Sequence, residues 1–116
     1  MCQTDEMEMP SISNLAAAEN DWSADLVFDS SARYFQGHFD GFPVLAGVVQ
    51  LGVARRLVER WVGRAMELSS VKRLKFSRVV RPGETVRLAL SKKKDSEFSF
   101  EYSKGGLPCA SGVLCF

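Results

Sequence analysis

Residues 34–54, with the sequence YFQGHFDGFPVLAGVVQLGVA, decide the fold of this chain. They hold its only histidine, His38, in a Gly-His-Phe turn, and an apolar run that opens at Ala46-Gly47 and predicts a buried helix. Histidine changes charge near neutral pH, and the first backbone N–H groups of a helix are unpaired and attract negative charge. An imidazole beside the start of a buried helix indicates a site for acyl chemistry.

The rest of the chain predicts one helix and five strands. The helix spans 46 to about 62, with Gly63 as its stop signal. Alternating apolar and polar residues, separated by turns such as 92–95 and Gly105-Gly106, predict strands at 22–29, 71–80, 85–91, 97–103 and 107–116. We expect residues 30–47 to form a long loop. This order predicts an α+β fold, in which a curved antiparallel meander wraps around one central helix.

The charges of the chain are unevenly distributed. Residues 1–32 carry seven acidic residues and no Lys or Arg, whereas residues 33–116 carry all fifteen basic residues against seven acidic ones. We expect residues 1–20 to be an acidic, flexible N-terminus with a short helical turn at 14–19, and residues 21–116 to form the folded domain. The basic domain suggests an acidic partner or substrate, and an ordinary solvated surface is the alternative. The sequence contains no combination of aromatic and basic residues typical of nucleic-acid binding, so we expect no nucleic-acid partner.

Neither a membrane protein nor a disulfide scaffold is expected. The N-terminus lacks the basic and apolar regions of a leader, and the apolar run at 44–54 is shorter than the ~20 residues that span a bilayer. The three cysteines are an odd number, and Cys109 and Cys115 are ~20 Å apart on one strand. We therefore predict free thiols and a cytoplasmic protein. A single histidine with no zinc-ligand spacing predicts no metal, and no cofactor is expected.

The element order and the 34–54 stretch together resemble the hotdog fold. The sequence GHFDGFPVLAGV at 37–48 is similar to the Gly-His-Phe-Pro-x-x-Pro-x-x-Pro-Gly-Val pattern of the 3-hydroxyacyl-(acyl-carrier-protein) dehydratases of fatty-acid and aryl-polyene synthesis. Lys75-Phe76 and Pro82-Gly83 match a later strand and turn of that family. The resemblance covers about residues 24–116. Asp40 and Ala46 replace two of the family's prolines.

This resemblance implies roles for individual residues. His38 would be the catalytic base, and the Gly47 N–H would polarise the thioester carbonyl. The family places a Glu or Asp from the partner subunit one turn further into the helix, where this chain has Gly52. Phe39, Pro43 and Val48 would contact the substrate together with Gly52.

The resemblance also implies partners. The substrate would be an acyl chain linked through phosphopantetheine to an acyl carrier protein, and the chain would be a homodimer. The helix surface with Arg55, Arg56 and Arg60 could dock that carrier, although an ordinary solvated surface is the favoured explanation of these arginines.

The missing carboxylate leaves three functions open. Asp40, Tyr34 or a cysteine could replace the acid, or His38 could act as base and acid in turn, whereas the Gln50 amide is a poor acid. A dehydratase is our first hypothesis. A thioesterase of the same fold is the second, and a catalytically inactive acyl-binding or partner subunit is the third. Gly52 favours the third, and His38 with the Gly47 helix start favours an enzyme.

Overall fold

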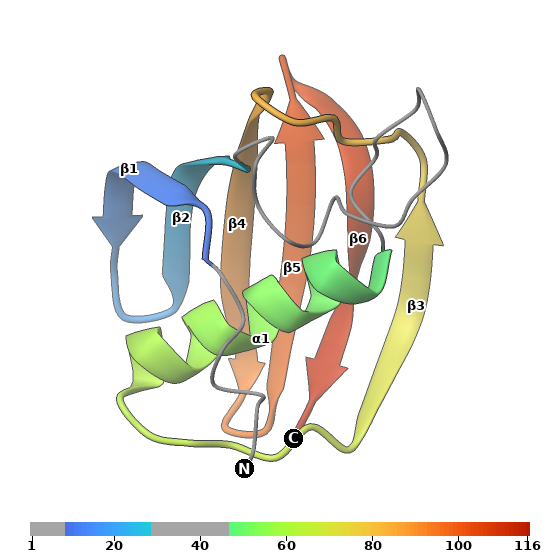
Figure 1. The fold of residues 1–116 in the computed structure, drawn as a ribbon. Coiled ribbons are helices and arrows are strands. Elements are labelled where there is room, and N and C mark those ends of the chain that lie inside the picture. The colour runs from blue at the N-terminus through green and yellow to red at the C-terminus, as the bar shows by residue number, and fades with distance from the viewer. Residues whose placement is uncertain (1–8, 29–46) are drawn as a thin grey trace, which may run out of the picture.

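A computed structural model describes residues 9–28 and 47–116 as one antiparallel sheet with one helix. The helix α1 spans Gly47–Val62. The strands are β1 (Ser11–Ala17), β2 (Asp21–Val27), β3 (Ser70–Phe76), β4 (Thr85–Lys94), β5 (Glu97–Lys104) and β6 (Leu107–Cys115). Figure 1 shows α1 lying across one face of the curved sheet, as the sequence predicted.

The strand order is β1-β2-β4-β5-β6-β3, and every neighbouring pair is antiparallel. The meander that the sequence predicted for the last four strands is confirmed only for β4, β5 and β6. Strand β3 instead pairs with β6 at the far edge, and β2 pairs with β4. The free edge of β3 and the hairpin of β1 and β2 therefore lie on opposite sides of the sheet (Figure 1).

Burial follows the alternation of the strand sequences. Strands β2, β4 and β5 bury every second side chain against the helix, as the period of two requires, whereas β1 and β3 are largely exposed. Helix α1 buries residues at the spacing of one helical face, Gln50, Val53, Ala54, Leu57 and Val58. Opposite it, the sheet contributes Trp22, Ala24 and Leu26 from β2, Val86, Leu88 and Leu90 from β4, and Phe98, Phe100 and Tyr102 from β5.

Two turns have the positive backbone φ angles that glycine permits. Gly63 has a φ of +89° and its N–H donates to the Glu59 carbonyl, so the helix ends where the sequence predicted. Gly105 and Gly106 have φ of +54° and +84° and join β5 to β6 in a two-residue turn.

Several predicted boundaries are wrong. A strand, β1, lies within the segment 1–20 that we expected to be flexible with a helical turn. Strand β3 ends at Phe76 rather than at residue 80, because the N–H groups of Ser77 and Arg78 both turn to the Cys109 carbonyl. Strand β4 continues to Lys94, through the turn predicted at 92–95, because Lys92 and Lys94 still pair with β5.

Candidate functional site at the start of the helix

The first turn of α1 is the part of the predicted site that the structure describes. Gly47 is the first helical residue, so its N–H is among the four that lack an acceptor within the helix. The ring of Phe76, at the end of β3, lies against it. A Cβ at position 47 would fall 2.6 Å from Phe76 Cζ and 3.0 Å from both ring Cε atoms. A side chain at position 47 would therefore need the half-exposed Phe76 ring to move, besides restricting any approach of a substrate.

The surface around this contact is apolar and open. Phe76 is 47% exposed although its ring packs on the helix, and Val48 is 74% exposed. The sequence predicted a buried helix around which the sheet wraps. The described residues leave Val48 uncovered, so an apolar surface borders the Gly47 amide.

Gly52 shares the exposed side of the helix with Val48. The two residues are four positions apart, and this spacing places them on one helix face. Gly52 is half-buried in the described structure. Gln50 points the other way and is buried, and its backbone carbonyl accepts a 2.6 Å hydrogen bond from the Tyr102 hydroxyl. A carboxylate at position 52 would therefore lie on the same side of α1 as Val48.

Several predicted site residues lie outside the described ranges. These are His38, Phe39 and Pro43, together with Asp40 and Tyr34, which we considered as replacements for the acid. The structure therefore brings Gly47, Val48 and Gly52 together on the first two turns of α1. The remaining assignments stay predictions.

The three arginines predicted to dock a carrier protein differ in their surroundings. Arg55 donates to the Met66 carbonyl at 3.1 Å and lies 3.5 Å from a Glu59 carboxylate oxygen. Arg56 is half-buried, and Arg60 is exposed in the last turn. Arg60 follows Gly47 by thirteen residues, which at a rise of ~1.5 Å per residue is about 20 Å along the helix. These side chains do not form one free cationic surface.

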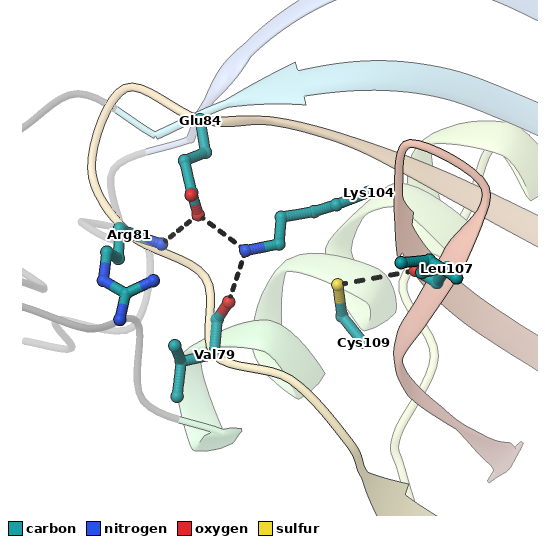
Figure 2. Close-up of polar contacts among 6 residues, drawn as sticks. All are labelled: Val79, Arg81, Glu84, Lys104, Leu107 and Cys109. Atoms are coloured by element: carbon teal, nitrogen blue, oxygen red, sulfur yellow. Dashed lines mark hydrogen bonds and ion pairs between the residues drawn. The ribbon is translucent and has the colours of Figure 1, made fainter.

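Of the connection between β3 and β4, residues 77–84, only the Pro82-Gly83 turn was identified from the sequence. Figure 2 shows the Lys104 ammonium between the Val79 carbonyl and the Glu84 carboxylate, both of which belong to this connection. Lys104 Nζ donates to the Val79 carbonyl at 2.8 Å and to Glu84 Oε1 at 3.0 Å, and the Arg81 N–H donates to the same oxygen at 2.7 Å. The Arg81 N–H, and then Lys104, hold the pKa of Glu84 below its ordinary value. The Glu84 carboxylate is thereby committed to structure.

Two further groups in the described part of the chain that could supply an acid or a nucleophile are buried. Burial raises the pKa of the Cys109 thiol, and burial alone raises the pKa of Tyr102. Cys109 and Cys115 are free thiols, as predicted. Within residues 9–28 and 47–116, no cluster of three metal-ligating side chains occurs, and no helix is long and apolar enough to cross a membrane.

Comparison with protein families gives a match over most of the chain. The model of the ApeI-like family, described as ApeI dehydratase, matches residues 14–113. A curated relative, the 3-hydroxyacyl-(acyl-carrier-protein) dehydratase FabZ of Latilactobacillus sakei, is 44% identical over 70 residues, which are 53% of this chain and 50% of that protein. The FabZ of Levilactobacillus brevis is 32% identical over 88 residues, 70% of this chain and 56% of that protein. The chain thus spans about half the length of the curated relatives it matches.

Solved structures agree on the fold. A chain of the dehydratase heterocomplex ApeI:P from Xenorhabdus doucetiae has a TM-score of 0.84 at 23% identity, covering 93% of this chain and 97% of that one. The Escherichia coli PaaI protein of a phenylacetic acid degradation operon has a TM-score of 0.63 at 13% identity, covering 89% and 79%. At these identities the likeness shows the fold alone, which is the hotdog fold.

Proposed function

Because the chain belongs to the ApeI-like dehydratase family, we propose that it removes water from 3-hydroxyacyl thioesters carried by an acyl carrier protein, in fatty-acid or polyene synthesis. The observation that carries this proposal is the start of α1. There the Gly47 N–H, which lacks an acceptor within the helix, lies near a half-exposed aromatic ring and an exposed valine. A thioester carbonyl can accept from that amide while its acyl chain contacts the apolar surface.

The elimination needs a base, a polariser and an acid. In our proposal His38 takes the C2 proton, and the electron pair of that C–H bond forms the C2=C3 double bond as the C3–O bond breaks. The Gly47 N–H stabilises negative charge that develops on the thioester oxygen, and one such donor can contribute ~3 kcal/mol. The hydroxyl leaves as water after it gains a proton, and the product is the 2-enoyl thioester.

The source of that last proton separates two forms of the proposal. In the first, this chain acts as a homodimer, and His38 returns the proton that it took. In the second, a different chain pairs with this one and supplies a carboxylate. Gly52 favours the second form, because it supplies no carboxylate and lies beside Val48 on the exposed side of the helix. The similar solved assembly is itself a dehydratase heterocomplex.

The test follows both possible products. The purified chain is incubated with 3-hydroxyacyl carrier-protein thioesters of several lengths, and enoyl product and free thiol are measured together. We expect enoyl product, and its loss in His38→Ala. Free thiol without enoyl product would make the chain a thioesterase instead. Equal rates with and without His38→Ala on every substrate, in the native chain and also in Gly52→Glu, would refute an enzymatic role.

A second variant distinguishes the homodimer from the mixed pair. Gly52→Glu restores a carboxylate at the position where the family has one. If the native chain works with a separate acid donor, the wild type alone is inactive, and Gly52→Glu alone gains dehydration activity. If the homodimer is complete, the wild type is active alone and Gly52→Glu gives no gain.

A further inference from the structure

The segment between Glu67 and Glu84 is the most one-sided in charge of the described chain. It contains Lys72, Arg73, Lys75, Arg78 and Arg81 and no acidic residue. Lys72 is neutralised by Glu97 at 3.2 Å, and Arg73 and Lys75 lie on the edge strand β3. Arg78 and Arg81 lie in the β3–β4 connection, residues 77–84, and both are exposed.

Hydrogen bonds hold this connection in one conformation. The N–H groups of Ser77 and Arg78 donate to the Cys109 carbonyl at 2.7 and 3.2 Å, and Arg78 Nη1 donates to the Pro108 carbonyl at 2.7 Å. Lys104 fixes the centre of the connection through the Val79 carbonyl (Figure 2). Because the backbone is fixed before any partner arrives, docking on it costs little ordering entropy.

The connection also exposes an apolar side chain between its two arginines. Val80 is fully buried in the core, so its neighbour Val79 is turned outward and is 45% exposed. A surface on which an exposed valine lies between two cations is suited to a partner that is acidic at its rim and apolar at the centre of contact.

This surface lies beside the candidate site. The connection begins directly after Phe76, whose ring packs on Gly47. In Figure 1 it crosses the end of the sheet to which β3 points, whereas α1 runs away from β3 toward the other edge. Arg60 is therefore at the far end of the helix from Gly47. Lys75 is next to Phe76, but alternate residues of a strand face opposite sides of the sheet.

We propose that Arg78, Val79 and Arg81 form the docking surface for the acidic carrier protein that delivers the acyl thioester to Gly47. This inference rests on the proposed function and replaces the helix arginines as the place of docking. It requires that carrier binding depend on these cations and that the chemistry on a carrier-free substrate does not.

Charge reversal tests this proposal with two readouts. Arg81→Glu is the main variant, because the hydrogen bond of Arg81 to Glu84 uses its backbone N–H, which the substitution keeps. The double variant Arg78→Glu/Arg81→Glu also removes the Pro108 contact. Matched controls are Lys75→Glu, on the other face beside Phe76, and Arg60→Glu, at the end of the helix. Calorimetric titration with a carrier protein bearing a nonhydrolysable 3-hydroxyacyl amide gives Kd, and turnover gives KM for carrier-linked and pantetheine-linked thioesters.

We expect Arg81→Glu to weaken carrier binding about threefold and the double variant about tenfold, with KM for the carrier thioester rising in parallel. Both effects should vanish in about 1 M salt, where the Debye length is ~3 Å. KM for the pantetheine thioester should stay within about twofold of the wild type.

Three results would overturn the docking surface. The first is a loss of carrier binding in Lys75→Glu or Arg60→Glu equal to that in Arg81→Glu. The second is a rise in KM for the pantetheine thioester equal to that for the carrier thioester. The third is a change in oligomeric state in sedimentation, which would make this surface a contact between copies of the chain. A wild type that turns over pantetheine thioesters but does not bind the carrier would refute docking and leave the dehydratase proposal intact. Carrier binding that depends on Arg81, with no turnover of any thioester, would support docking and refute the dehydratase proposal.

Discussion

The ring of Phe76 occupies the space into which a side chain at Gly47 would project, with Phe76 Cζ 2.6 Å from an ideal Cβ at that position. Real Cβ atoms are not found this close to another carbon, so one of the two groups must move if residue 47 has a side chain. The contact joins the first residue of the helix to the last residue of the edge strand. It therefore fixes where the Gly47 amide lies relative to the sheet.

A double-mutant cycle at these two residues separates packing from catalysis. Gly47→Ala should lower the free energy of unfolding by up to about 1 kcal/mol, because the added methyl group displaces the half-exposed ring. In Gly47→Ala/Phe76→Ala the clash is gone, so urea denaturation should show a favourable coupling of at least ~0.5 kcal/mol.

The dehydratase rate of the same variants gives a separate result. If the thioester approaches Gly47 closely, the methyl group still blocks it in the double variant, and activity stays low although stability returns. Recovery of both stability and activity would show that Gly47 is needed only for its packing with Phe76.

The hydrogen bond from Tyr102 to the helix is a second contact that can be tested. The Tyr102 hydroxyl is fully buried and donates to the Gln50 carbonyl at 2.6 Å, within the first turns of α1. Tyr102→Phe removes the donor and keeps the ring, so we expect the free energy of unfolding to fall by about 1 kcal/mol with an unchanged m value in urea. Ser69→Ala, which removes a 3.0 Å bond from an exposed serine to the Cys115 carbonyl, is the control and should cost less. An equal loss in both variants would contradict a special role for Tyr102.

Elements with regular apolar periodicity were predictable from the sequence. Helix α1 ends before Gly63 as expected, and β2, β4 and β5 each bury the alternate residues that their sequences mark. Strand β1 was missed because nearly all its side chains are exposed, so no alternation reports its pairing with β2. The edge position of β3 was missed because local turns do not reveal a partner as distant in sequence as β6.

The candidate site shows the same limit. Gly47 was identified from the 34–54 motif, and Phe76 was noted only as part of a Lys-Phe match. Their contact, and the bridge of Lys104 to Glu84 across the β3–β4 connection, depend on side chains brought together from separate elements. No spacing along the chain encodes such contacts, because each depends on the final position of two elements.

Gly112 is a second glycine whose packing can be tested. A Cβ there would lie 2.9 Å from Phe100 Cε2 and 3.3 Å from the Lys72 carbonyl oxygen. Gly112→Ala should therefore destabilise the sheet by about 1–3 kcal/mol in urea denaturation. Because the backbone oxygen cannot move away, Phe100→Leu in the same chain should recover only part of that loss. Full recovery would show that the ring alone restricts this position.

Asp25, on the outer face of the sheet, should make stability depend on pH. Asp25 accepts from Asn14 Nδ2 at 2.7 Å and from Arg87 Nη1 at 2.9 Å, on the strand pair β2 and β4. The bond from Asn14, and then the bond from Arg87, hold the pKa of Asp25 below its ordinary value near 3.8. The folded state therefore binds this proton less readily than the unfolded state. The stabilisation is complete well above pH 3.8 and is lost as pH falls through 3.8 toward the lower folded-state pKa.

Urea unfolding followed from pH 7 to pH 3 tests this assignment. Asp25→Asn should flatten the fall in the free energy of unfolding below about pH 4, because the group that protonates is gone. Ser23→Ala removes the 2.8 Å bond from Arg87 Nη2 to the serine hydroxyl and no titrating group. It should lower stability by a similar amount at every pH and leave the slope unchanged. A slope that stays the same in Asp25→Asn would assign the acid-dependent loss to another carboxylate, of which Glu84 is the first candidate, since its pKa is also held below the ordinary value.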